Sequence, residues 1–337
     1  MIRLILRRLA AAVPSLLGVI VVTFVISHTL PGDPSAFFAG PSATPESIAA
    51  TRAELGLDRP LPIQFADYTF DLLQGDLGQS FTSGQPVLDD LLRRLPASLE
   101  LTLFALLFAV IVALPLGLLA AANPGSWVDH ICRGTVTAAA AFPSFFVGLL
   151  LIFVFYYSFN IAPSPVGRLE IFFATPPKIT GFYTIDALIA GDIHVARAAF
   201  GQLILPAVSL GLFALAPLAR MTRASMLGVL GSEFITTARA EGLSSWTILV
   251  TYGFRNALLP LVNVLGMIFS FLLGANVLIE QVFGWPGVGS YAVEAVLVSD
   301  YAAIQGFVVM MAFLYILLNL AMDILNTVVD PRVRYDS

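Results

Sequence analysis

The side chains that most often carry out chemistry are sparse in this 337-residue chain and lie far apart. There are three histidines, His28, His130 and His194, and a single cysteine, Cys132. The histidines lack the spacing of metal ligands, and one cysteine forms neither an internal disulfide nor a cysteine-based metal cage. We therefore expect neither a metal nor another cofactor in this chain.

Sequence motifs of catalysis are also missing. The only lysine, Lys178, is not part of a Gly-x-x-x-x-Gly-Lys-Ser/Thr loop, so the chain has no phosphate cradle of that type. There is neither a Gly-x-Ser-x-Gly elbow nor a His-Glu-x-x-His motif. The net charge of −5 argues against a nucleic-acid partner, because nucleic acids select basic surfaces. We interpret the chain as non-catalytic.

The composition indicates a lipid bilayer as the environment. The chain is 58% hydrophobic and only 12% charged, whereas soluble domains carry about 25% charged residues. A bilayer core needs around 20 apolar residues as a helix, and only helices or closed barrels satisfy the backbone in lipid. We predict an all-α integral membrane protein with six transmembrane helices: Leu9–Leu30, Leu101–Ala122, Val136–Phe159, Phe200–Ala219, Ala257–Ile279 and Tyr301–Met322.

Charged residues avoid the middle of these spans. Glu280 falls at the outer end of the fifth span and Asp323 at the inner end of the sixth. Because ion-coupled transporters place carboxylates deep in the membrane, we interpret both as loop or interface contacts rather than proton relays. A secondary transporter is weakened by this observation but stays an alternative.

Basic residues predict the orientation, because cytoplasmic loops carry an excess of them. Three arginines in Met1–Arg8 precede an apolar block that is too long for a cleaved signal peptide, and we interpret it as a retained span. With this end inside, ten basic residues fall in inner segments and seven in outer ones. We predict an inner (plasma) membrane protein with both termini in the cytoplasm.

The outer segment Pro31–Glu100 has four basic and ten acidic residues. Thr44-Pro45-Glu46 is typical of a helix start, Pro62–Leu73 is amphipathic, and Gly75–Gly78 indicates a turn. We expect a small folded extracytoplasmic layer. A second outer segment, Ala162–Ala199, is rich in proline.

Two features of the spans have alternative interpretations. Prolines occur in five of the six, where they form either simple kinks or the hinges of a moving bundle. Gly266, Ser270 and Gly274 share one face of the fifth span, which allows close helix packing. The partner helix lies either within this chain or in another subunit.

One polar cytoplasmic segment, Arg220–Arg255, joins the fourth and fifth spans. Ser232 followed by Glu233 is typical of a helix start, and Gly242 is typical of a left-handed residue that ends a helix. A short amphipathic surface helix would account for this pattern. Its isolation between two spans also favours docking to a partner.

This segment carries a resemblance to a known family. Thr236-Thr237-Ala238-Arg239-Ala240-Glu241-Gly242-Leu243, followed by Phe254-Arg255-Asn256-Ala257-Leu258-Leu259-Pro260, resembles the coupling loop of oligopeptide and dipeptide ABC-importer permeases. Thr236 and Thr237 stand where the wider importer family has Glu and Ala, while Ala238 and Gly242 match. Similar motifs follow in order along nearly the whole chain: Leu30–Pro34, Leu55–Pro60, Gly75–Ser80, Leu95–Glu100 and Glu280–Gly289. The long first outer segment resembles that of the B-type, dipeptide permease-like subunits.

The resemblance implies a type I ABC importer permease fold that forms half of a translocation pore. It also implies a second permease subunit in a heterodimer, two ATPase subunits, and an extracytoplasmic substrate-binding protein. The expected contact with an ATPase subunit comprises Glu233, Phe234, Thr237, Ala238, Arg239, Ala240, Glu241, Gly242 and Leu243. We expect Ala238 and Ala240 to let the coupling helix approach the ATPase closely.

We accordingly divide the chain into residues 1–30 with the first span, 31–96 as the outer helical segment, and 97–330 with five spans and a coupling loop around 226–255. The solute is a peptide or a similar small polar molecule. Dipeptides, oligopeptides, glutathione, nickel chelates, opines and sugars all stay open. Besides a secondary transporter or channel, a membrane enzyme and a structural scaffold are the alternatives.

Overall fold

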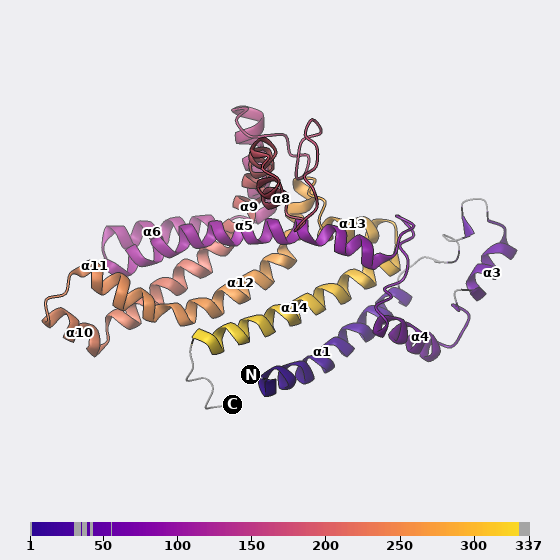
Figure 1. Cartoon of the computed structure of the whole chain (residues 1–337), viewed down its shortest axis with the longest axis horizontal. Coiled ribbons are helices and arrows are strands. Elements are labelled where there is room, and N and C mark those ends of the chain that lie inside the picture. Colours follow the sequence, from indigo (N-terminus) through magenta and orange to yellow (C-terminus); the bar gives the residue numbers. More distant parts are fainter. Residues whose placement is uncertain (1, 30–34, 36–38, 41–42, 55, 330–337) are drawn as a thin grey trace. The chain divides into compact units, whose positions relative to one another are not determined.

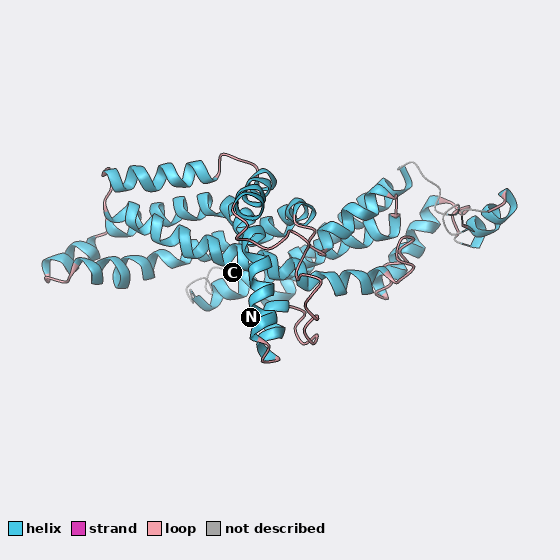
Figure 2. Cartoon of the chain, turned by 90° about the horizontal axis from the view of Figure 1, so that it is seen from above, coloured by secondary structure: helices cyan, strands magenta, loops and turns pink. Residues whose placement is uncertain are grey.

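The computed structural model describes residues 2–29, 35, 39–40, 43–54 and 56–329. In this part of the chain the regular structure is helical (Figure 1, Figure 2), apart from an isolated bridge between Gln79 and Pro86. The predicted all-α class is confirmed. The helices are α1 (Ile2–Thr29), α3 (Pro45–Glu54), α4 (Leu61–Leu73), α5 (Val87–Ala122), α6 (Trp127–Ala139), α7 (Ser144–Leu151), η1 (Ile152–Ser158), α8 (Tyr183–Ile189), α9 (Ile193–Leu230), α10 (Glu233–Ala240), α11 (Ser245–Thr247), η2 (Ile248–Phe254), α12 (Arg255–Val282), α13 (Val288–Leu297) and α14 (Tyr301–Val329), where η marks a π-helix.

The chain forms two compact units. The first consists of Met1–Leu95 and Gly287–Leu317, and the second of Pro96–Pro286 and Leu318–Ser337. Two of the three boundaries fall inside α5 and α14, so each of these helices contributes to both units, and the third falls between α12 and α13. The division into residues 1–30, 31–96 and 97–330 stays a prediction.

Four helical stretches of the described residues are long and apolar enough to cross a bilayer: Val87–Ala122, Ile193–Leu230, Pro260–Val282 and Tyr301–Leu325. They overlap the predicted second, fourth, fifth and sixth spans. Within α1 the apolar stretch Ala10–Ile26 is shorter, and Leu30 lies outside the described residues. The count of six spans therefore stays a prediction.

The predicted third span, Val136–Phe159, is wrong as a single helix. The helical segments Trp127–Ala139 and Ser144–Ser158 meet at an angle of 92°. Pro143 stands at the break, where it lacks an N–H for the helix ladder and disfavours the helical conformation of Phe142. By contrast, α5, α9 and α12 continue through their internal prolines.

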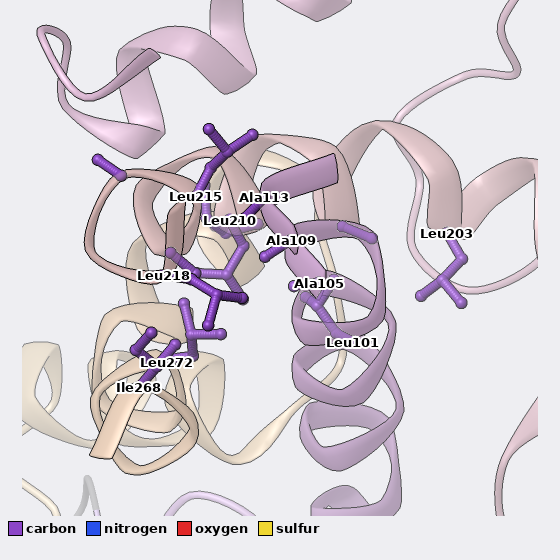
Figure 3. Close-up of a cluster of buried hydrophobic side chains, with 14 of the residues drawn as sticks. Leu101, Ala105, Ala109, Ala113, Leu203, Leu210, Leu215, Leu218, Ile268 and Leu272 are labelled. Carbon is purple, nitrogen blue, oxygen red and sulfur yellow. The ribbon is translucent and has the colours of Figure 1, made fainter. Parts of the chain in front are cut away.

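Four alanines and one leucine, spaced four residues apart, form the buried face of α5 in the second unit. Ala97, Leu101, Ala105, Ala109 and Ala113 are all buried in one cluster. In Figure 3, Ala109 and Ala113 of α5 lie beside Leu210 and Leu218 of α9, and Ile268 and Leu272 of α12 lie beyond them. Because α5 contributes mainly alanines to this contact, α9 can approach it closely, as expected for helix association in lipid.

Two glycines mark the closest approaches of α5 and α9. A Cβ atom added to Gly211 of α9 would lie 2.6 Å from the carbonyl oxygen of Ala105. One added to Gly117 of α5 would lie 2.8 Å from the carbonyl oxygen of Ala219 and 2.6 Å from the Cβ of Thr222. Because both contacts involve backbone, any side chain at either glycine would force the two helices apart.

The small residues of α12 have two different environments. A Cβ at Gly266 would meet the side chain of Met322 at 2.5 Å, whereas one at Gly274 would meet nothing within 4 Å. Gly266 therefore packs within this chain. At Gly274 a contact with another subunit stays a prediction.

The first unit confirms the helices and the turn predicted between residues 43 and 78. Thr44 accepts a hydrogen bond from the N–H of Ser47 at the start of α3, and α4 covers the predicted amphipathic stretch. Gly75 and Gly78 adopt positive φ angles of 83° and 80° in the turn that follows. The motif Leu30–Pro34 and Leu55 lie outside the described residues.

Candidate functional site

The α10 loop, residues 231–247, contains the predicted coupling helix in the second unit. Ser232 is the N-cap residue of α10, and Glu233 lies in the first turn, where a carboxylate is favoured by the helix dipole. The hydroxyl of Ser232 donates to the carbonyl of Val229 instead of capping α10. The predicted helix start is therefore correct, but its capping hydrogen bond is not formed.

Gly242 ends α10 in the way that the sequence predicts. Its φ angle is +79°, in the left-handed region that favours glycine. The N–H of Gly242 donates to the carbonyl of Arg239 at 3.0 Å, and the N–H of Leu243 donates to that of Ala238 at 3.2 Å. This pair of bonds is the Schellman motif, which satisfies the last carbonyls of a helix and turns the chain away.

The inner face of α10 packs on its own chain. Ile235 and Ala238 are buried together with Ile248 of η2, and Leu230 and Leu243 pack against them. The methyl group of Ala238 faces the core of the loop, so in this arrangement Ala238 is not open to an ATPase subunit, contrary to expectation. Helical spacing of three between Ile235 and Ala238 places both on the same face.

The outer face of α10 is exposed and chemically mixed. Its exposed residues are Glu233, Phe234, Thr236, Thr237, Arg239, Ala240 and Glu241. Phe234 exposes 46% of its surface, and Trp246 of α11 exposes 72%. Eight of the nine predicted contact residues, all except Ala238, thus keep at least part of their surface open; Leu243 is half-buried.

The π-helix η2, which follows α10 and α11, packs the α10 loop against α9. A Cβ at Gly253 of η2 would lie 2.9 Å from the side chain of Met226 on α9. Met226 is itself buried with Ala121 of α5 and Ala257 of α12. Through these contacts α10 is connected to the ends of three long helices.

The second unit also contains a buried polar site that the sequence did not predict. Glu100 is buried and accepts hydrogen bonds from Arg168 at 2.5 Å and from the hydroxyl of Thr184 at 2.6 Å. The same Arg168 nitrogen donates to the carbonyl of Gly181, and the guanidinium lies 3.7 Å above the ring of Tyr183. Nearby in the sequence, Ser98 donates to Glu280 at 2.5 Å.

These five residues, Ser98, Glu100, Arg168, Thr184 and Glu280, are called the buried polar cluster below. The indole N–H of Trp285 also donates to the carbonyl of Ala97. The cluster therefore joins the two motifs Leu95–Glu100 and Glu280–Gly289, which are far apart in sequence, to the segment Ala162–Ala199. Glu280 lies within α12 and contacts Ser98 of α5, so it forms a buried contact between two helices and not the loop or interface contact that the sequence suggested.

Asp186 fixes the turn beside this cluster. Its carboxylate accepts hydrogen bonds from the N–H groups of Ile179, Thr180 and Gly181 and from the hydroxyl of Thr180. Burial opposes the charged form, but the four hydrogen bonds outweigh it and lower the pKa of Asp186. Among the described residues, no three His, Cys, Asp or Glu side chains gather as metal ligands would.

The chain is similar to known membrane proteins along nearly its whole length. Residues 113–335 match the family described as "Binding-protein-dependent transport system inner membrane component", and residues 1–102 match its N-terminal counterpart. The chain is 43% identical over 316 residues to the probable D,D-dipeptide transport system permease DdpB of Escherichia coli K12, with 94% of this chain and 93% of that one covered. It is 40% identical to the dipeptide transport system permease DppB of the same strain, over 99% of both chains.

A solved structure shares the fold. An inward-facing structure of the MetNI methionine ABC transporter has a chain that matches with a TM-score of 0.53. The match covers 71% of this chain and 96% of that one, at 19% identity. At this identity the likeness establishes the fold alone.

Proposed function

The chain belongs to the family of binding-protein-dependent transport system inner membrane components and is a non-catalytic permease subunit of an ABC importer; from this premise we propose that it carries dipeptides or other short peptides. The observation that supports this substrate class is identity of 40% over 99% of the chain to a dipeptide permease, outer segment included. The subunit acts with a second permease, ATPase subunits and a binding protein.

The proposed substrate is tested by uptake of a radiolabelled dipeptide into proteoliposomes that contain the complete importer. Unlabelled dipeptides should compete, whereas nickel chelates, opines and sugars should not. Competition by one of those solutes, without competition by dipeptides, would overturn the substrate assignment and leave the permease assignment intact.

The α10 loop is the proposed docking site for an ATPase subunit. Its support is the division of α10 into a buried face against Ile248 and an exposed face with Glu233, Phe234 and Arg239. An exposed aromatic beside charged groups is typical of the anchors of protein interfaces. The inner face would then carry movement of the ATPase to α9 and η2, as rigid bodies.

The orientation follows from this docking site. If α10 meets an ATPase that works on cytoplasmic ATP, then the α10 loop is cytoplasmic, and so are both termini if there are six spans. This agrees with the ten basic residues in the predicted inner segments against seven in the outer ones. The loop Ile161–Phe182 and the first outer segment then face the binding protein.

Crosslinking tests the docking site directly. A cysteine at the exposed position Thr237 should form a crosslink with an ATPase subunit in the assembled importer. A cysteine at Asn123, exposed in the loop between α5 and α6, is the matched control and should crosslink far less. Equal crosslinking at both positions, or none at Thr237, would contradict the assignment.

A further inference from the structure

A cavity of about 290 Å³ lies between α5, α6 and α9 in the second unit. Part of its wall is apolar and includes Leu116, Ala120 and Val136. The rest includes three arginines, Arg133, Arg220 and Arg223. A cavity at the lower end of the roughly 300–1,000 Å³ typical of ligand pockets suits a small polar group with an apolar attachment.

The charges around this cavity do not balance. The buried carboxylate of Asp129 accepts two hydrogen bonds from Arg223, at 2.8 and 2.7 Å, and lies 3.3 Å from Arg133. Among the described residues, no carboxylate forms an ion pair with Arg220, which is exposed. One carboxylate and three guanidinium groups leave an excess of positive charge, which favours an anionic ligand.

The surroundings of the cavity point to lipid as the source of that anion. Arg220 directly follows the apolar stretch Phe200–Ala219, at the end of the fourth span that the sequence predicts. On α6, Trp127 and Ile131 are 73% and 57% exposed and are four residues apart, on one face of the helix. An exposed tryptophan and isoleucine on one face are typical of a helix surface in contact with the interfacial region of a bilayer.

We propose that this cavity binds the phosphate headgroup of an anionic phospholipid of the cytoplasmic leaflet. Arg133 and Arg220 contact the phosphate, while Asp129 holds Arg223 in place and limits the charge. The acyl chains leave along the apolar side of the cavity. The leaflet rests on the proposed orientation, in which Arg220 is cytoplasmic; basic pockets between membrane helices on that side bind anionic headgroups.

Native mass spectrometry of the assembled importer, released from nanodiscs of phosphatidylglycerol and phosphatidylcholine, tests the site. The wild-type importer should retain phosphatidylglycerol in preference to phosphatidylcholine. Arg220→Ala and Arg133→Ala should each lower that preference about fivefold, the usual effect of one basic residue at an anionic membrane surface. Arg255→Ala is the matched control, because Arg255 is exposed but does not line the cavity. Unchanged retention in both cavity variants would overturn the proposal.

The single cysteine supplies a second measurement, because Cys132 lines the cavity. Its alkylation by a small maleimide, followed by peptide mass spectrometry, should be slower in phosphatidylglycerol nanodiscs than in phosphatidylcholine ones. Equal rates in both lipids would contradict lipid binding and indicate a protein cover. Equal protection by inorganic phosphate in phosphatidylcholine would identify a free anion as the ligand instead.

The orientation is tested separately, so that its failure is distinguishable. Nanodiscs expose both membrane surfaces, and the two measurements above do not depend on orientation. In inside-out vesicles a membrane-impermeant maleimide should label a cysteine introduced at the exposed Ser245, and in right-side-out vesicles it should not. The reverse result would remove the cytoplasmic leaflet from the proposal but leave the headgroup site standing.

Discussion

The α10 loop and the buried polar cluster use the same residue types, glutamate, arginine and threonine, in opposite ways. In α10, Glu233, Thr237 and Arg239 are exposed, and apolar side chains hold the helix on its own chain. In the cluster, Glu100, Arg168 and Thr184 are buried, and Glu100 accepts hydrogen bonds from both of the others. Polar groups that are already paired inside the chain have little left for a partner, whereas the face of α10 can still form new contacts.

Breaking the buried cluster should have the largest effect on stability. Glu100→Ala leaves the guanidinium of Arg168 buried without its carboxylate, and removing one partner of a buried ion pair destabilises by about 3–5 kcal/mol. We expect a marked fall in the thermal stability and yield of the detergent-solubilised importer. The double variant Glu100→Ala, Arg168→Ala should be destabilised by less than the sum of the single variants. Additive effects would show that the two groups do not interact.

Gly242→Val should have the largest effect in the α10 loop. A β-branched residue strongly disfavours a φ of +79°, and forcing a non-glycine residue there costs about 1–3 kcal/mol. A Cβ at this position meets no atom within 4 Å, so the effect comes from backbone conformation alone. ATP-dependent uptake should be lost while the importer still assembles. Gly242→Asn is the matched control and should keep most uptake, because asparagine tolerates this conformation.

A pair of tryptophan substitutions separates the two faces of α10. Ala238→Trp overfills the buried contact with Ile248, and overpacking typically costs about 1–3 kcal/mol. Ala240→Trp adds a large side chain to the exposed face and should leave thermal stability unchanged, yet reduce uptake by blocking the ATPase. Normal uptake in Ala240→Trp would place that position outside the docking surface.

The smallest change in stability is expected when the pH is lowered. The pKa of Asp186 is lower in the folded chain than in the unfolded one, where it is about 4. Its ionised form therefore stabilises the fold at higher pH, and this contribution fades as the pH falls below about 4 towards the folded value. Between pH 5 and 3 the melting temperature should fall more in the wild-type importer than in Asp186→Asn. Parallel curves for the two proteins would contradict this role.

Local features of the fold could be predicted from the sequence because neighbouring residues determine them. The start of α10 at Ser232 and its end at Gly242 depend on residues within one or two turns. The stripe of Ala105, Ala109 and Ala113 could also have been found, since a small residue every fourth position is visible in the sequence. The break at Pro143 could also have been predicted, because proline is common at the start of a helix.

The long-range contacts could not be predicted in this way. Glu100 and Arg168 are 68 residues apart, and one sequence carries no sign that they pair. Which face of α10 is buried depends on Ile248, beyond the end of the helix. Ala238 was therefore assigned to the partner by its small size, which suits a tight contact within the chain equally well.

The two glycine contacts between α5 and α9 determine how this pair of helices can move. Ala105 and Gly117 are twelve residues apart on α5, and their partners Gly211 and Thr222 are eleven apart on α9, so the contacts are separated by about 18 Å along parallel axes. Two helices in contact at one point can change their crossing angle about that point, but two helices in contact at two distant points cannot. A force applied to α10 would therefore move α5 and α9 together, as one rigid body.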